Sequence, residues 1–162
     1  MSEHEPQVQQ RPAQPYLAIH AHVASEADFR RAADQGFPEL FGWLGEHEIT
    51  PAGPLFIRYL VVDDDGDPRE IELGVPVAPG IPGDERVRSG ELPAGRWATF
   101  LHVGPYRSET EPDLAAGRAT LRAWADAQGL SRADYVEHFV KGPVEEPDHA
   151  RWETELAYLT TA

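Results

Sequence analysis

Two glutamates with matching surroundings are the residues of this sequence best suited to chemistry. Glu155 lies among apolar and aromatic residues in the segment 151–159, and Glu72 has the same position in the segment 69–77, where Ile-Glu-Leu replaces Thr-Glu-Leu. An ionised carboxylate beside aromatic rings can pair with a flat, delocalised organic cation. The alternative is a strand acid that faces water, because charged side chains are seldom buried without a partner.

The alternation of side chains along a strand predicts where these two acids point. Successive side chains of a strand lie on opposite faces of the sheet. Glu155 is therefore opposite in direction to Leu156, and Glu72 is opposite to Leu73. If the two leucines pack against helices, both carboxylates face the other side of the sheet, where we expect a ligand cleft.

The elements that position these acids are predicted twice along the chain. Trp43 and Trp124 are 81 positions apart, and Glu72 and Glu155 are 83 apart, so each half carries similar landmarks in the same order. This order predicts an α+β fold of duplicated β-α-β-β units with pseudo-twofold symmetry, in which an antiparallel sheet has two main helices on one face and a ligand cleft on the other. The expected strands are 16–23, 55–62, 69–77, 87–92, 96–103, 135–140 and 151–159, and the expected helices are 37–47, after a short helical turn at 28–35 that Gly36 ends, and 112–128.

Length and composition predict one domain in a reducing compartment. We expect residues 1–14, which are rich in Gln, Pro and Glu, to be a disordered leader, and residues 15–162 to form a single ligand-binding domain. The absence of cysteine excludes disulfides and thiolate chemistry. No segment has the apolar length of a membrane span or a signal peptide, so a cytoplasmic location is predicted.

The formal net charge of −14 excludes one class of partner in particular. Nucleic acids are bound by cationic side chains that neutralise phosphates, and here acidic residues outnumber basic ones by 28 to 14. We therefore expect no nucleic-acid partner. The sequence also carries no helix-turn-helix region, so direct control of DNA is not expected. An acidic surface favours cationic ligands instead.

Metals and cofactors are not predicted. His20 and His22 share a strand face and His102 lies on another strand, but no convincing third ligand is close in sequence. The consecutive aspartates of residues 63–67 lack the alternating spacing of a calcium loop and read as a hairpin turn. The sequence also has no phosphate-binding glycine loop and no nucleophile elbow.

Five short stretches in order resemble the GyrI-like small-molecule-binding domains, and the resemblance covers residues 16–159. The resemblance implies a doubled β-α-β-β sheet with a central cleft, used as the effector-binding half of multidrug-sensing and AraC-type regulators. The stretches are residues 54–59 (PLFIRY), 71–77 (IELGVPV), 92–97 (LPAGRW), 102–106 (HVGPY) and 152–156 (WETEL).

The resemblance also implies roles for particular residues. Some free-standing members bind drugs, and others hydrolyse cyclopropane-bearing natural products with a Tyr and a Glu, which by motif correspond to Tyr106 and Glu155. In that case Glu155 would act as a general base or acid beside the Tyr106 hydroxyl. The aromatic residues expected to line the cleft are Trp97, Tyr135, Phe139 and Trp152, although strand parity turns Trp152 away from Glu155 unless a bulge intervenes.

The preferred hypothesis is therefore a binding protein for flat, hydrophobic, often cationic aromatic molecules. Two alternatives stay open at this point. The first is a hydrolase of cyclopropanoid electrophiles that uses Tyr106 and Glu155. The second is an acidic protein that inhibits a DNA-binding protein by docking on it.

Overall fold

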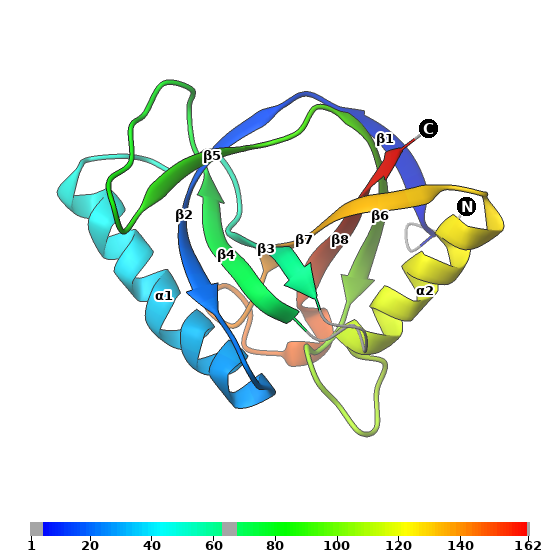
Figure 1. Ribbon diagram of the computed structural model, residues 1–162. Coiled ribbons are helices and arrows are strands. Elements are labelled where there is room, and N and C mark those ends of the chain that lie inside the picture. Colours follow the sequence, from blue (N-terminus) through cyan, green and yellow to red (C-terminus); the bar gives the residue numbers. More distant parts are fainter. Residues whose placement is uncertain (1–4, 63–67, 162) are drawn as a thin grey trace. The chain divides into compact units, whose positions relative to one another are not determined.

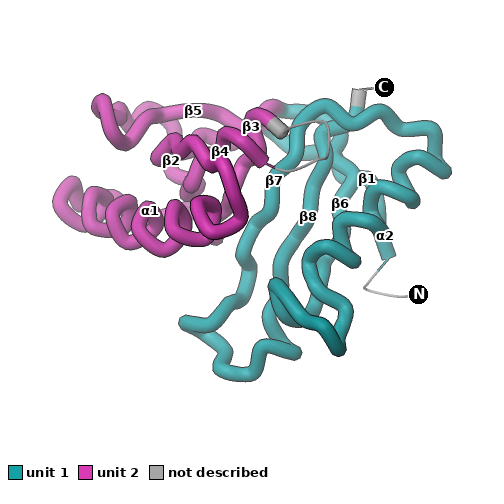
Figure 2. The backbone as a smooth tube through the Cα atoms, turned by 60° about the horizontal axis from the view of Figure 1, so that its bottom comes forward, with its two compact units in different colours: residues 1–12, 94–162 teal, residues 13–93 magenta. Residues whose placement is uncertain are grey.

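The computed structural model describes residues 5–62 and 68–161. The acidic turn at residues 63–67, for which calcium was considered, lies outside the described residues. The chain forms two compact units, one from residues 1–12 and 94–162 (unit 1) and one from residues 13–93 (unit 2), as Figure 2 shows. The prediction of a single domain over residues 15–162 stays a prediction.

Unit 2 is a four-stranded antiparallel sheet with one helix packed on it (Figure 1). Its strands run in the spatial order β3-β4-β2-β5, and helix α1 packs against β2 and β4. Their alternating apolar residues meet the apolar stripe of the helix, which is why the two elements bury a common core. The elements are β2 (Gln14–His22), α1 (Glu26–Glu46), β3 (Phe56–Val62), β4 (Pro68–Pro76) and β5 (Arg88–Leu92).

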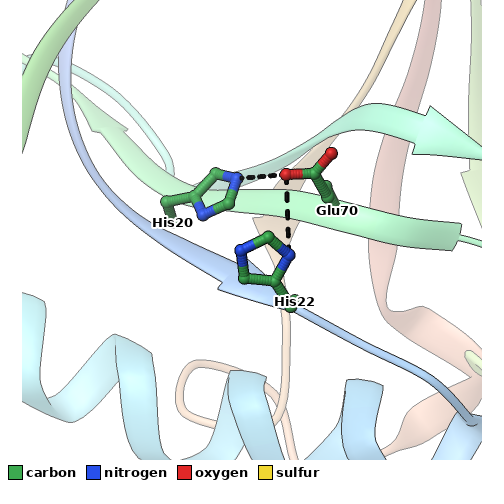
Figure 3. Close-up of side chains that lie close together, drawn as sticks. All are labelled: His20, His22 and Glu70. Carbon is green, nitrogen blue, oxygen red and sulfur yellow. Dashed lines mark hydrogen bonds and ion pairs between the residues drawn. The ribbon is translucent and has the colours of Figure 1, made fainter.

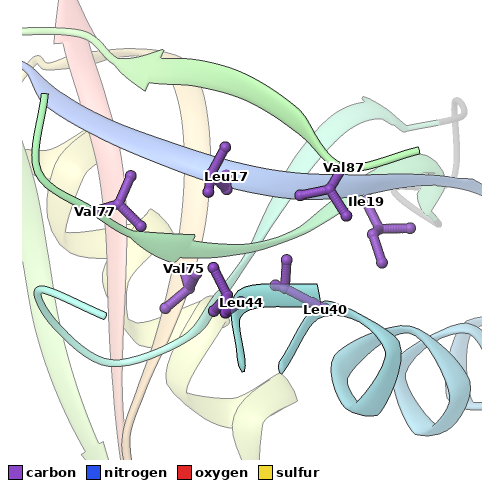
Figure 4. Packing of buried hydrophobic residues seen from close by; sticks show 7 residues of the cluster. All are labelled: Leu17, Ile19, Leu40, Leu44, Val75, Val77 and Val87. Atoms are coloured by element: carbon purple, nitrogen blue, oxygen red, sulfur yellow. The ribbon is translucent and has the colours of Figure 1, made fainter. Parts of the chain in front are cut away.

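The core of unit 2 joins leucines of the helix to aliphatic residues of the sheet (Figure 4). Leu40 and Leu44 of α1 pack against Leu17 and Ile19 of β2 and against Val75 of β4. All five side chains are at most 2% exposed. Burying a side chain of this kind contributes about 1.5–3 kcal/mol, so this cluster fixes which face of β2 and β4 lies under the helix.

Helix α1 is longer than the sequence predicted. It begins after Ser25, whose hydroxyl accepts a hydrogen bond from the backbone N–H of Asp28, and it continues through Gly36 and Pro38 to Glu46. The predicted break at Gly36 is wrong, because this residue lets the helix approach the side chain of Leu73 where a Cβ would collide with it. Tertiary packing has here overridden the low helix propensity of glycine.

Unit 1 has the same plan. Its antiparallel strands run in the order β1-β6-β8-β7, and helix α2 packs against β6, β7 and β8. Leu114 and Leu121 of α2 pack with Ala98 of β6 and Leu156 of β8. The elements are β1 (Gln7–Arg11), β6 (Gly95–Val103), α2 (Leu114–Ala127), β7 (Ser131–Lys141), the short 3-10 helix η1 (His149–Arg151) and β8 (Glu153–Thr161).

The N-terminal residues differ from expectation. Residues 1–14 were expected to be a disordered leader, whereas Gln7–Arg11 form the edge strand β1, paired with β6 from Gln7 opposite Thr99 to Arg11 opposite Gly95. The strand forms although the segment has little apolar alternation, because an edge strand is held by backbone hydrogen bonds that do not depend on side-chain type. Residue 14 likewise begins β2.

The duplicated order predicted from the sequence is confirmed. The α+β fold repeats strand, helix, strand and strand as β2-α1-β3-β4 and as β6-α2-β7-β8. The fourth strand of each unit comes from the other half of the sequence, since β1 pairs with β6 and β5 pairs with β2. Among the described residues, no helix is both long and apolar enough to cross a bilayer.

Candidate functional site

The predicted direction of the two glutamates agrees with the packing of their neighbours. Leu156 is fully buried in the cluster that α2 covers, so Glu155 lies on the opposite face of the unit 1 sheet. In unit 2, Leu73 lies against Gly36 of α1, so Glu72 lies on the face away from that helix. Each acid therefore belongs to the face of its sheet that its own helix leaves uncovered.

Glu155 is paired with one cation on this face of unit 1. The guanidinium Nη1 of Arg11, on β1, lies 2.8 Å from its Oε1, and the two side chains are 26% and 25% exposed. Trp97 of β6 is 3% exposed and pairs in register with Leu159, which shares the face of Glu155. Glu155 is thus an ionisable group on a surface with a buried aromatic residue, and its charge is balanced from an edge strand.

His138 is the direct neighbour of Glu155 on β7, since the two residues are register partners. Burial lowers the pKa of His138 to about 4, although the charge of Glu155 acts in the opposite direction and Arg11 acts with burial. The imidazole is therefore neutral at pH 7, where it does not offset the negative charge of Glu155.

Glu72 is held differently, by a tyrosine and an arginine of unit 2. The Tyr16 hydroxyl donates to Glu72 Oε1 at 2.5 Å, and Arg58 Nη1 donates to the same hydroxyl at 2.8 Å while lying 3.9 Å from Glu72 Oε1. Burial, and then the hydrogen bond to the carboxylate, raise the pKa of Tyr16 well above its usual value. The ring of Phe56 meets Tyr16 edge-on at 5.1 Å between centroids, over Gly74, where a Cβ would collide with Phe56.

Sequence reasoning found Glu72 but missed Tyr16 and Arg58. Arg58 is the register partner of Glu72 on β3. On β2 the register partner of Glu72 is His20, and Tyr16 lies four residues before His20. Strand parity alone places all four residues on one face. The contact from Tyr16 to Glu72 depends on the diagonal reach of a long side chain, which no sequence spacing encodes.

Tyr106 lies on the α2 side of unit 1. Its ring packs against the cluster beneath α2 and contacts Trp152 at 4.7 Å and Phe139 at 5.6 Å between centroids. Burial, with a smaller contribution from the charge of Glu145, raises its pKa to about 12. The structure therefore places Tyr106 and Glu155 on opposite faces of the sheet, which differs from the pairing that the motif implied.

Of the four aromatic residues predicted to accompany Glu155, three lie on the α2 side of the unit 1 sheet instead, as Tyr106 does. Tyr135 packs on the α2 cluster and its hydroxyl donates to Glu137 Oε2 at 2.6 Å. Phe139 is the register partner of Thr154 and so shares the face of Leu156, and Trp152 contacts Tyr106 with the two rings tilted. Trp97 is the one of the four that shares the face of Glu155.

A family model for the GyrI-like small molecule binding domain matches residues 4–157. The chain belongs to the GyrI-like small-molecule-binding domain family. The match includes the whole of β1 (Gln7–Arg11), so this strand is part of the family domain.

Solved structures share the fold of this GyrI-like domain at low sequence identity. EcmrR in a DNA complex is 17% identical with a TM-score of 0.80 over 97% of this chain, and this chain spans only 57% of that one. A hydrolase encoded by lin2189 from Listeria innocua is 12% identical with a TM-score of 0.63, over 98% of this chain and 92% of its own. SAV2435 bound to tetraphenylphosphonium is 12% identical with a TM-score of 0.60, over 98% and 94%. No curated protein sequence matches the chain.

A pocket of about 450 Å³ in unit 2 lies beside the Tyr16 side chain of this GyrI-like domain. Gly90 of β5 lies under the Tyr16 ring, where a Cβ would come within 2.6 Å of the ring carbon Cζ. The absence of a side chain at residue 90 is therefore what allows the ring to lie over β5. The rest of the lining comes from residues 77–81 and from Pro15, Ser89 and Glu91.

Three potential metal ligands also gather in unit 2, on the face of β2 and β4 away from α1 (Figure 3). The sequence offered His20 and His22 but no third ligand close in sequence; the structure supplies Glu70, which is the register partner of His22. His102, the third histidine considered, lies in unit 1, where its Nε2 is 3.1 Å from the carbonyl oxygen of Pro105. The sequence analysis missed Glu70 because only the register of β2 with β4 places it opposite His22.

Proposed function

We propose that this GyrI-like domain binds flat, hydrophobic organic cations and that Glu155 supplies the countercharge. The observation that carries the proposal is the ion pair of Glu155 with Arg11 on the sheet face opposite α2. A carboxylate that already holds a delocalised, planar cation has the geometry and the charge to hold another. Trp97 lies on the same face of the sheet, but it is 3% exposed and its register partner is Leu159, so the proposal rests on the charge pair and not on this ring.

The neutral state of His138 supports the same proposal. Because its pKa is lowered to about 4, this neighbour contributes no positive charge near pH 7. The negative charge of Glu155 is balanced on its own sheet by Arg11, whose guanidinium lies 2.8 Å from the carboxylate. A ligand cation that displaces Arg11 neutralises the charge of Glu155 in its place, and its aromatic groups also bury apolar surface.

We favour binding over hydrolysis for this chain. A Tyr and a Glu that act together on one substrate must approach the same reacting atoms within hydrogen-bond distance. Tyr106 lies on the α2 side of the sheet and Glu155 on the other, so the tyrosine that belongs to the family motif is not in position to assist Glu155. The hydroxyl closest to a candidate glutamate is that of Tyr16, which is engaged by both Glu72 and Arg58.

Titration with tetraphenylphosphonium tests the binding of a hydrophobic aromatic cation, since that cation is the one bound to the structural neighbour SAV2435. Because it is tetrahedral at phosphorus, a planar cationic dye titrated in parallel tests the preference for flat molecules. We expect saturable binding with quenching of tryptophan fluorescence and weaker binding of the neutral analogue triphenylphosphine oxide. Glu155→Gln should weaken cation binding by about fivefold to thirtyfold, which corresponds to about 1–2 kcal/mol for a partly exposed charge pair. Equal affinity of the wild type and the Gln variant would sink the proposal.

A matched control comes from the same strand. Glu153 lies two residues before Glu155 and is ion-paired with Lys141 at 3.1 Å, so Glu153→Gln removes the same charge at nearly the same exposure. We expect it to leave cation affinity within about twofold of the wild type. Incubation with a cyclopropane-bearing alkylator, followed by mass spectrometry, separates binding from turnover, because a binder protects only in proportion to its amount.

A further inference from the structure

The face of unit 2 away from α1 brings two imidazoles and a carboxylate to one point. His20 and His22 are two residues apart on β2, so their side chains leave the same face, and Glu70 projects beside them from β4. His20 Nε2 lies 3.1 Å from Glu70 Oε1, and His22 Nδ1 lies 3.6 Å from the same oxygen. Figure 3 shows both rings turned toward the carboxylate.

These separations match those between ligands of a bound metal ion. One ligand atom from each residue lies within 4.8 Å of the other two. Metal–nitrogen and metal–oxygen bonds of about 2.0–2.2 Å place neighbouring ligand atoms of a tetrahedral site about 3.3 Å apart. The distances from Glu70 Oε1 to the two imidazole nitrogens, 3.1 and 3.6 Å, are close to this spacing, and the paired strands β2 and β4 hold the backbone in place.

The ligand types select a class of metal. Two imidazole nitrogens and one carboxylate oxygen suit divalent ions of borderline character such as Zn²⁺, Co²⁺ and Ni²⁺, whereas Ca²⁺ and Mg²⁺ prefer oxygen alone. The chain has no cysteine to favour soft ions. Three protein ligands also leave at least one coordination position open for water or for a donor atom of a ligand.

The site is accessible from solvent. The side chain of His22 is 79% exposed, that of Glu70 is 33% exposed and that of His20 is 23% exposed. An ion can therefore reach the three ligands without a change in the fold. Tyr16 and Glu72 lie on the same face of the sheet, since His20 pairs with Glu72 in register and Tyr16 is four residues from His20.

We propose that His20, His22 and Glu70 form a binding site for one divalent transition-metal ion. The ion replaces the hydrogen-bonding contact between Glu70 and His20 and joins β2 to β4 through side chains. The three ligands belong to unit 2 and Glu155 belongs to unit 1, so the site shares no residue with the cation binding proposed above.

Calorimetric titration of untagged protein with ZnCl₂ tests the site, and Co²⁺ provides a visible absorption spectrum that reports coordination by nitrogen and oxygen. We expect one ion per chain and a rise in the midpoint of thermal unfolding on saturation, because the ion binds the folded chain. His20→Ala and Glu70→Gln should each weaken binding by at least about tenfold and abolish the cobalt spectrum. Circular dichroism shows whether each variant keeps its fold.

The matched control is His149→Ala, which removes another histidine that pairs with an acid. His149 Nε2 lies 3.0 Å from Glu111 Oε2, and among the described residues this pair belongs to no group of three potential metal ligands. This variant should bind Zn²⁺ with the affinity of the wild type. Wild-type protein that binds no ion at millimolar ZnCl₂, or a folded His20→Ala/His22→Ala variant that binds as tightly as the wild type, would overturn the proposal.

Discussion

The ion pair between Arg11 and Glu155 makes an unusual prediction about the variant Arg11→Ala. If an organic cation binds by replacing the guanidinium, then Arg11 competes with the ligand for the same carboxylate. Removing Arg11 should therefore strengthen cation binding, whereas loss of an ordinary ligand contact would weaken it. The direction of the change separates the two roles.

The size of the effect follows from the geometry of the pair. Two unit charges about 4 Å apart attract by about 4 kcal/mol at the effective dielectric constant of a protein surface. Desolvation, side-chain entropy and salt reduce the net value of a pair whose side chains are 26% and 25% exposed to about 1 kcal/mol. We therefore expect Arg11→Ala to bind tetraphenylphosphonium about fivefold more tightly than the wild type.

Isothermal titration calorimetry of a double-mutant cycle provides the assay. The gain from Arg11→Ala should disappear in the Glu155→Gln background, because no carboxylate remains for the arginine to occupy. Lys141→Ala is the control for net charge, since it also removes one positive charge from unit 1, at the pair with Glu153. Unchanged or weaker binding by Arg11→Ala, or an equal gain with Lys141→Ala, refutes the competition.

Three further outcomes follow from the charged groups of the two units. Glu72→Gln should lower the pKa of Tyr16, because the carboxylate raises it; an ultraviolet titration that shows no change contradicts the hydrogen bond from Tyr16 to Glu72. The pKa of His138 is lowered to about 4 in the folded chain, so between about pH 6.5 and pH 4 this histidine binds a proton in the unfolded chain but not in the folded one. The free energy of unfolding should therefore drop by up to about 3 kcal/mol as the pH falls through this window. His138→Gln should remove this drop, which urea unfolding at several pH values measures. Arg118→Ala removes the bidentate partner of the Glu137 carboxylate, which is 1% exposed, and should lower the free energy of unfolding by about 3 kcal/mol in urea. A loss below about 1 kcal/mol would show that the hydrogen bond from the Tyr135 hydroxyl is enough to stabilise the buried carboxylate.

The sequence was sufficient for the order of elements within the two repeated β-α-β-β units and for the parity of the two glutamates. Alternation of apolar residues in 69–77 and 151–159 indicated which side chains meet a helix, and Leu73 and Leu156 are indeed buried there. The short motifs were sufficient for the family. Both signals are local, because a strand has a period of two residues whatever lies beside it.

Two errors came from reading local propensity as the final structure. Gly36 predicted the end of a helix, yet α1 continues through it because the residue packs closely on Leu73. The polar composition of residues 7–11 predicted disorder, yet β1 pairs with β6 through its backbone. In both cases a partner distant in the sequence outweighed the local preference.

The composition of the sites was decided by strand register, which the sequence does not contain. Tyr16 meets Glu72 across 56 residues of chain, and Glu70 meets His22 across 48, because β2 pairs with β4 in one particular alignment. Tyr106 and Glu155 were expected together but lie on opposite sides of the unit 1 sheet. The sequence thus determined the fold family, the repeat and the face on which each glutamate lies, whereas only the tertiary structure decided which side chains reach it, since those contacts depend on how strands align across the sheet.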